Sequence, residues 1–338
     1  MYFDFCRSII VRELYCLKTG GKRHYDLTIP RLIAKEEKKP LFLVWLRMVL
    51  SVVVTGCTFQ EYYNLKFAQR TIKNQKTFIT TGSNLKAYKK LNDEAYYHLY
   101  INKDEFNKTY SQFIGRDWIQ LCQTKREQIY VFFRKHCDVI VKPRSGDSGK
   151  GIFIVHNSNQ MTTAEIDELI QRNEQGIVEE LLRNHPKLDE LNASSLNTMR
   201  VVTVRNGATV KILFAGIRFG AEGKEIDNIS MGGRVAPIDP VTGTICGHSH
   251  SKKTVNTTDE ENENYVGFQM PMWDDLQTYL LGLTAVVPQM RYMAWDIAIT
   301  PKGFVTIEGN HSSGNTVTQA HIGTKEQGLR VNLIKWVT

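Results

Sequence analysis

The sequence lacks the features that mark several large classes of protein. Its 338 residues include six cysteines that lie far apart, with no Cys-x-x-Cys pair. This spacing excludes a disulfide framework and a zinc ribbon, and it favours a reduced chain in the cytoplasm. The first 16 residues carry scattered charges and no apolar core of signal-peptide length. We therefore expect no export.

The sequence also has no apolar run long enough to cross a bilayer. The most apolar stretch, residues 41–54, is interrupted by Arg47 and falls short of the ~18 uncharged residues required. We expect a helix there, buried or lying on a surface, and its composition favours burial. No repeat or low-complexity tract occurs, although residues 251–264 are typical of an exposed polar excursion.

Charge is unevenly distributed along the chain. The net formal charge is +8, but residues 1–150 hold 27 lysines and arginines against 14 acids, while residues 151–338 hold 16 against 21. Such asymmetry indicates an anionic partner of the first half, such as a phosphate, lipid headgroup or acidic glycan. The alternative is a solvated surface. No signature of a nucleic-acid-binding fold accompanies the basic residues, so we expect no nucleic acid partner.

The periodicity divides the chain into a helical part and a mixed part. Residues 1–100 show bulky apolar and charged residues at helical spacing. After Cys137, short β-branched runs alternate with turn residues, which predicts an α+β or α/β domain. A capping box from Thr162 to Glu165 predicts the start of a helix that ends near Gly176.

Two strand pairs and a helix are predicted in the second half. Residues 199–204 and 210–220 are separated by Asn206 and Gly207, which indicates a hairpin. A helix over residues 273–287 precedes two further strands, which are joined by a turn at residues 301–303.

A lysine followed by small residues is the densest chemical signal. Lys142 ends a predicted strand and opens into residues 143–151, which are rich in glycine and serine. Glycines let backbone amides approach a phosphate, and the ammonium supplies a point charge. The segment is not a Walker loop, because Arg144 and Gly151 stand where glycine and Ser or Thr are needed. Taken alone, it could also be an ordinary hairpin turn.

Asp296, Glu308 and Asn310 form a second group. Glu308 and Asn310 share one face of a predicted strand, and a short turn brings Asp296 beside them. Two carboxylates and an amide oxygen suit Mg²⁺. The alternative is that these residues are ordinary acids on the surface, although their apolar neighbours in sequence argue against full exposure.

Arginines and a glycine-rich loop lie between these two groups. Arg200 and Arg218 offer donor forks for carboxylate or phosphate, and Asn228 precedes the pair Gly232 and Gly233. Together with Arg234 they would place positive charge opposite the acidic corner, as phosphoryl transfer requires. Each one alone could be a surface ion pair.

The order of these motifs resembles the ATP-grasp superfamily. The motifs follow one another in the order found in those ligases: a lysine, a Gly-rich loop, VEEL, a TxR strand, DN with GG, WD and ExN. The blocks FQEYYNLKF, NKDEFNK, SLNTMRVVTV, DNISMGGRV and AWDIAIT are most similar to the sugar-transfer-associated ATP-grasp proteins of bacterial polysaccharide gene clusters. The likeness covers residues 40–320.

The resemblance implies a fold and a set of site residues. The fold would be the α+β ATP-grasp fold, two subdomains clamping ATP, with a helical region over residues 1–100 and an ATP-grasp domain over 101–338. Within that domain, a lid subdomain would span about 137–183 and a metal and substrate subdomain about 194–338. The implied ATP contacts are Lys103, Lys142, Ser145, Gly146, Ser148, Gly149, Gly151, Glu179, Glu180 and Leu182; the metal ligands are Asp296, Glu308 and Asn310; the acyl-phosphate is held by Arg200 and Asn228, with Arg218 and Arg234 as further candidates.

Three assignments stay open. Lys108 could replace Lys103 as the first phosphate-binding lysine. Several relatives carry an arginine at the position of Ala294. Here the positive charge that stabilises the transition state would come instead from Arg200, Arg218 or Arg291. The acid that contacts the ribose could be Glu180, Asp189 or Glu190.

The resemblance also implies a reaction. ATP would phosphorylate a carboxylate, and an amine would attack the acyl-phosphate, with Mg²⁺ as the metal. The carboxylate would be a uronic acid or other sugar-linked acid in capsule or exopolysaccharide synthesis. The alternatives are a non-catalytic nucleotide-binding scaffold of a glycan-assembly complex and a sugar kinase. We expect a cytoplasmic protein, with contact to a membrane or an anionic glycan through its basic N-terminal region.

Overall fold

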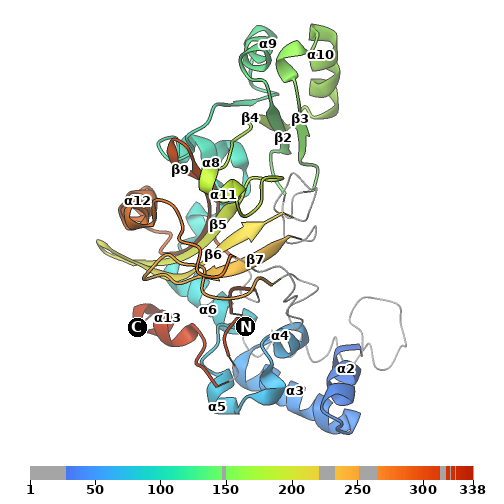
Figure 1. The fold of residues 1–338 in the computed structure, drawn as a ribbon, viewed down its shortest axis with the longest axis vertical. Helices are drawn as coiled ribbons and strands as arrows, with labels where there is room; N and C mark the ends of the chain where they lie inside the picture. Colours follow the sequence, from blue (N-terminus) through green and yellow to red (C-terminus); the bar gives the residue numbers. More distant parts are fainter. Residues whose placement is uncertain are drawn as a thin grey trace.

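The computed structural model describes residues 28–146, 150–220, 233–250, 265–312, 317–319, 321–323 and 325–337. Figure 1 shows an elongated molecule with a four-stranded sheet at one end, a five-stranded sheet in the middle and a group of helices at the other end. The strand pairs are antiparallel and the helices are not interleaved with parallel strands, so the predicted α+β class is confirmed.

The first part of the described chain is helical, as predicted. Thr58 and Thr80 each accept a backbone amide three residues on, and these caps begin the helices α4 and α6. The buried Glu61 carboxylate also accepts the backbone amides of Thr58 and Thr81, which fixes the two helix starts together. The helices are α2 (Thr28–Glu36), α3 (Leu41–Thr55), α4 (Phe59–Asn64), α5 (Ile72–Gln75), α6 (Thr81–Leu91), α7 (His98–Ile101) and α8 (Lys103–Thr109).

Helix α3 is buried on one face only. Val44, Met48 and Val52 are completely covered, whereas the opposite side of the helix is exposed. The expectation of burial therefore holds for one half of its circumference. None of the helices in the described part of the chain is long and apolar enough to cross a membrane.

The four-stranded sheet has the order β1-β4-β2-β3. Its strands are β1 (Trp118–Gln120), β2 (Val139–Pro143), β3 (Phe153–Val155) and β4 (Gly176–Glu180), and α9 (Arg126–Lys135) and α10 (Thr163–Arg172) cover one face. The predicted capping box at Thr162 is present. Helix α10 ends at Arg172, because Gly176 already begins β4. Strand β1 and helix α9 lie ahead of residue 137, the expected start of the lid.

The five-stranded sheet has the order β7-β6-β5-β8-β9. Both predicted hairpins and the predicted helix are present. The strands are β5 (Thr198–Asn206), β6 (Thr209–Phe219), β7 (Arg234–Ile238), β8 (Tyr292–Thr300) and β9 (Gly303–Asn310). Helix α12 (Trp273–Ala285) packs on one face, and α6 and α13 (Arg330–Val337) cover part of the other. The part of that second face left by α6 and α13 carries the polar side chains described next.

Candidate active site

The pairing of β8 with β9 brings the three predicted metal ligands together. Asp296 is the register partner of Glu308, and Ala294 is the partner of Asn310. Cross-strand partners share a face, as do residues two apart on one strand, so both carboxylates and the amide lie on one face of the sheet. The Asn310 amide donates to Glu308 Oε1 at 3.3 Å.

Two predicted arginines meet the same cluster from β5 and β6. Arg200 is the register partner of Asp296, and its Nε lies 2.7 Å from Asp296 Oδ1. Arg218 Nη1 donates to Asp296 Oδ2 at 3.0 Å, while its Nε donates to Thr198 Oγ1 at 3.0 Å. Both guanidinium groups are thus held in place beside the carboxylates.

The two carboxylates share their proton unequally. Burial, and then the neighbouring Glu308, raise the pKa of Asp296 to about 7 in spite of the two arginines. Burial alone would raise the pKa of Glu308, but a hydrogen bond from Asp296 and the charges of Arg200 and Arg218 lower it to about 2. These two acids therefore retain one proton between them at pH values well above the usual titration range of aspartate.

The donor set at this cluster fits Mg²⁺. Asp296 Oδ1 is completely buried, and in spite of the nearby guanidinium of Arg200 it accepts no hydrogen bond of acceptable geometry. Carboxylate and amide oxygens are the protein ligands that Mg²⁺ takes, and it leaves positions for phosphate oxygens. A cation would also remove the repulsion between two adjacent buried carboxylates.

A second buried charge cluster lies on the four-stranded sheet. Lys142 Nζ donates to Glu179 Oε2 at 2.5 Å, and Arg116 Nε donates to the same oxygen at 2.9 Å. Arg116 Nη2 and Asn107 Nδ2 donate to Glu179 Oε1 at 3.0 and 2.9 Å. Burial alone would raise the pKa of Glu179, but Arg116 and Lys142 hold it far below its usual range.

Arg116 connects this cluster to strand β9. Its Nη1 donates to the carbonyl of Thr306 at 3.0 Å, and its Nη2 lies within hydrogen-bond distance, 3.4 Å, of the Ile307 carbonyl. Those two residues directly precede Glu308 on β9. Lys142, which is predicted to bind phosphate, is therefore linked through Glu179 and Arg116 to the strand that carries Glu308 and Asn310.

Lys103 lies against the segment that follows Lys142. Its Nζ donates to the Gly146 carbonyl at 3.2 Å, and its backbone amide donates to the Arg144 carbonyl at 2.9 Å. Ser145 forms an isolated bridge with Asn102. Gly151 has a φ of 72°, and a Cβ there would lie 2.9 Å from Pro143 Cγ, so this turn requires glycine. Ser148 and Gly149 lie outside the described residues.

Two further implied ATP contacts, Glu180 and Leu182, lie at the last residue of β4 and just beyond it. The amide of Glu180 donates to the Asp117 carbonyl at 2.9 Å, and its carboxylate accepts the Asp117 amide at 3.2 Å. Leu182 is half-buried beyond the strand. Asp189, at the end of α11 (Pro186–Asp189), accepts a hydrogen bond from Asn184 at 2.9 Å, and both Asp189 and Glu190 are exposed. The ribose contact stays open among these acids.

Two predicted residues that the structure describes, Arg234 and Arg291, do not contact the Asp296–Glu308 cluster. Arg234 pairs in register with Phe219, which places it on the opposite face from Arg218. Arg291 directly precedes β8, whereas Asp296 lies at the middle of that strand, and Arg291 Nε donates to the Arg205 carbonyl at 3.0 Å. Asn228 lies outside the described residues. Of the three arginines considered as replacements at Ala294, Arg200 and Arg218 are the two in contact with Asp296.

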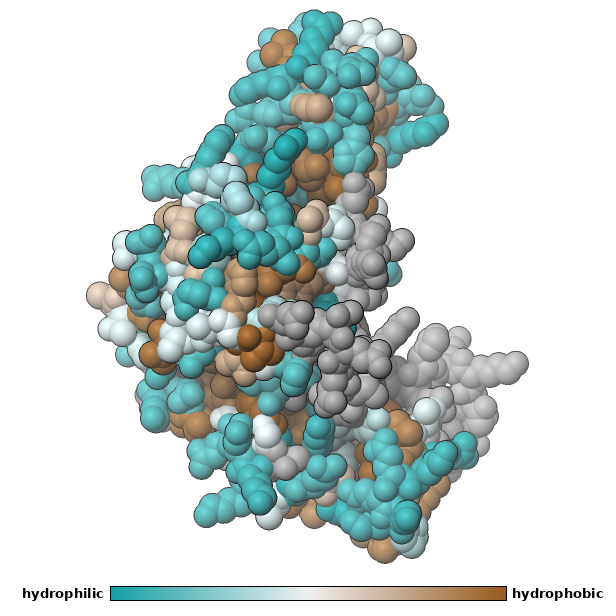
Figure 2. Space-filling model, viewed as in Figure 1, coloured by the Kyte–Doolittle hydropathy of each residue, from teal (hydrophilic) through white to brown (hydrophobic). Residues whose placement is uncertain are grey.

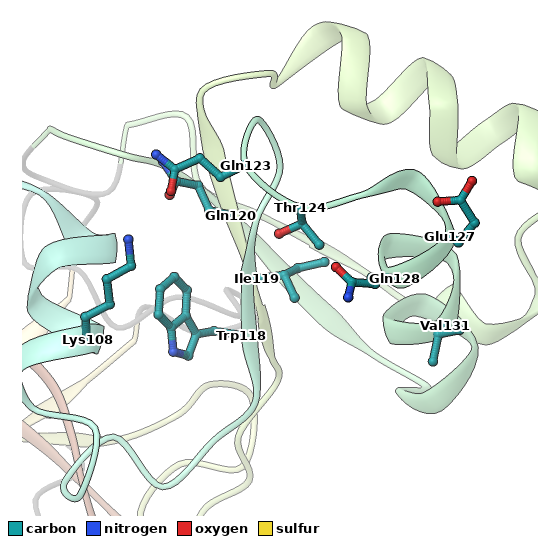
Figure 3. A pocket seen from close by; sticks show the side chains of 9 residues that line it. All are labelled: Lys108, Trp118, Ile119, Gln120, Gln123, Thr124, Glu127, Gln128 and Val131. Carbon is teal, nitrogen blue, oxygen red and sulfur yellow. The ribbon is translucent and has the colours of Figure 1, made fainter.

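Sequence reasoning missed Arg116 and Asn107. Arg116 lies in none of the recognised motifs, and Asn107 lies within the NKDEFNK block but was given no role; only the fold shows that both contact Glu179. Sequence reasoning also missed a pocket of about 600 Å³, which lies along β1, an edge strand of the four-stranded sheet. Figure 3 shows its lining, with Lys108 of α8 on one side and side chains of α9 on the other. Lys108, the alternative to Lys103, therefore faces this pocket.

Comparison with solved structures gives distant likenesses. The ATP-grasp ligase PsnB is 13% identical with a TM-score of 0.45, and the match covers 76% of this chain and 67% of that one. D-alanyl-alanine synthetase A from Vibrio cholerae is 13% identical with a TM-score of 0.42, over 71% and 66% of the two chains. The D-alanine-D-alanine ligase from Coxiella burnetii is 14% identical with a TM-score of 0.41, over 71% and 57%. This chain thus spans between 57% and 67% of the length of these proteins.

The sequence itself gives a family. No curated protein matches the chain. Residues 84–333 match the family described as sugar-transfer associated ATP-grasp, which is most of the chain and contains both charge clusters. The prediction made from the motifs is thereby confirmed: the chain belongs to the sugar-transfer associated ATP-grasp family.

Proposed function

We propose that this chain is an ATP-dependent carboxylate-amine ligase that works through an acyl-phosphate. The observation that carries the proposal is the meeting of Arg200 and Arg218 with Asp296 and Glu308 on one sheet face. Carboxylates for a cation and guanidinium groups for phosphate oxygens are the two components that phosphoryl transfer needs.

Each part of the site has a task in this reaction. Lys142 and Lys103, with the segment from Ser145 to Gly151, bind the β- and γ-phosphates of ATP. Asp296, Glu308 and Asn310 hold Mg²⁺, which neutralises phosphate charge when bound. Arg200 and Arg218 orient the acyl-phosphate, and Asn228 is proposed for the same task. Positioning and electrostatics then supply most of the acceleration, and no side-chain nucleophile is needed.

The reaction balances in two steps. An oxygen of the substrate carboxylate attacks the γ-phosphorus, which forms the acyl-phosphate and releases ADP. The amine nitrogen then attacks the acyl carbon, so a C–N bond forms, phosphate leaves and the amine proton passes to solvent. We propose a uronic acid or other sugar-linked acid as the carboxylate, and an amino acid or small amine as its partner, in polysaccharide synthesis.

Trapping with hydroxylamine tests the proposal. The protein is incubated with ATP, Mg²⁺ and a panel of uronic and other sugar-linked acids, and hydroxamate is measured together with ADP. Hydroxamate that depends on one acid marks an acyl-phosphate. A stable phosphorylated sugar would instead show a kinase, and ATP binding without either product would show a scaffold.

Variants of the metal ligands give a second test. Asp296→Asn and Glu308→Gln should each lower ADP release at least a hundredfold, while circular dichroism shows an intact fold. Asp275→Asn, an exposed acid in the first turn of α12, is the matched control and should keep normal turnover. Near-normal turnover in both ligand variants would refute the metal assignment.

A further inference from the structure

Helix α3 carries an exposed apolar stripe, which consists of Phe42, Leu43, Leu46, Leu50 and Val53. Together with Leu41, these side chains are between 38% and 68% exposed. They make up six of the sixteen large exposed apolar side chains in the described ranges. Isolated exposed apolar residues are normal, but a concentration of this kind on one helix marks an interaction surface.

The stripe is opposite the buried side of the helix. At 3.6 residues per turn, its five members fall within an arc of about 100°, and the buried positions Val44, Met48 and Val52 lie across the helix from it. Fifteen residues make a helix of only about 22 Å, less than the ~30 Å of a hydrocarbon core. The helix can therefore lie in a membrane interface but cannot span it.

Exposed basic residues are concentrated in the segment of the chain that contains α3. Helices α2, α4 and α5 pack on α3, and Figure 1 shows this group at the end of the molecule remote from the four-stranded sheet. Over residues 28–76, seven lysine and arginine side chains are exposed against a single exposed acid, Glu36. The seven are Arg31, Lys35, Lys38, Lys39, Lys66, Lys73 and Lys76. In Figure 2, brown apolar surface lies beside teal surface at this end.

We propose that α3 docks this chain onto an anionic phospholipid surface, with the apolar stripe inserted among the acyl chains and the basic residues on the headgroups. The positive charge of this end of the chain favours a lipid surface over a second copy of the chain as the partner of α3. A second copy would bring like charges together, and residues 1–27 are themselves basic, with five lysines and arginines against three acids. An acidic glycan offers charge but no apolar layer for the stripe. A bilayer surface with anionic lipids offers both.

Vesicle flotation of the full chain tests this proposal, which does not depend on the ligase chemistry. Vesicles of phosphatidylcholine alone are compared with vesicles that contain 30% phosphatidylglycerol. We expect binding to the anionic vesicles that is at least tenfold tighter and falls as salt is added. Leu46→Gln combined with Leu50→Gln should weaken that binding at least tenfold. Lys35→Glu with Lys38→Glu should do the same.

The matched control is Leu85→Gln with Leu281→Gln, which removes two exposed leucines from α6 and α12. It should float like the unchanged protein. Far-ultraviolet circular dichroism spectra should be equal in all variants, which separates loss of docking from loss of folding. Three results would overturn the proposal: no flotation of the unchanged protein, flotation that the stripe variant keeps, or a dimer in sedimentation that the stripe variant dissociates.

Discussion

Among single residues, Asp296 gives the clearest expectation for how Mg²⁺ binding depends on pH. Its raised pKa of about 7 means that, below this pH, the folded metal-free protein holds a proton that Mg²⁺ must displace. We expect the apparent affinity for Mg²⁺ to fall about tenfold per pH unit below pH 7. Titration calorimetry in two buffers of different ionisation enthalpy measures the proton released.

The sign for stability follows from the same shift. An acid whose folded pKa lies above its unfolded value favours folding when it is protonated, so metal-free protein should lose stability as pH rises from about 4 to 7. Mg²⁺ should reverse this trend. An affinity for Mg²⁺ that is flat between pH 5 and 7 would contradict the shared proton.

Removal of the Arg116 side chain should cost much stability. It is buried with Glu179, and Arg116→Ala leaves that carboxylate with Lys142 and Asn107 alone. Breaking a buried pair from one side costs about 3–5 kcal/mol. Urea unfolding at pH 7 measures the loss. The control Arg126→Ala breaks the exposed pair with Asp167 and should cost under about 1 kcal/mol. Equal losses would contradict the role given to Arg116.

Among the elements, helix α10 depends on its cap. Thr162 accepts the Glu165 amide, and the Glu165 carboxylate accepts the Thr162 amide at 2.7 Å. Thr162→Ala should destabilise the four-stranded subdomain by about 1 kcal/mol, because an amide loses its partner. The neighbour Thr163→Ala, inside the first turn, is the control and should change little. Urea unfolding followed by circular dichroism distinguishes them.

The helices and strands also show which parts of the fold could be predicted from the sequence. Turns at Asn206–Gly207 and residues 301–303, the cap at Thr162 and the alternation on β8 and β9 are local signals, so the hairpins could be predicted. The same signals predict that Asp296, Glu308 and Asn310 share one sheet face, while their role as Mg²⁺ ligands stays a prediction. Glu179 was identified without its partners, because Arg116 and Asn107 reach it only through long-range packing. For α3, average hydropathy indicated burial but not which half of the helix a neighbour would cover.

At the scale of the whole molecule, one side chain joins two subdomains. Arg116 ties Glu179 on β4 to the carbonyls just before Glu308 on β9. A nucleotide held by Lys142 and a cation held by Glu308 would add a further connection across the same junction. Ligand binding should therefore stabilise the molecule as a unit, rather than one sheet alone.

Thermal unfolding tests this coupling. Mg²⁺ with ADP at 100 times its Kd adds about 2.7 kcal/mol, which for a chain of this size raises Tm by roughly 5 °C. Lys142→Ala keeps Arg116 and Asn107 on Glu179, so the protein should still fold, but the same ligand concentration should no longer raise Tm. Lys187→Ala, an exposed lysine on α11, should keep the full shift. A full shift in Lys142→Ala would mean that the phosphates bind elsewhere.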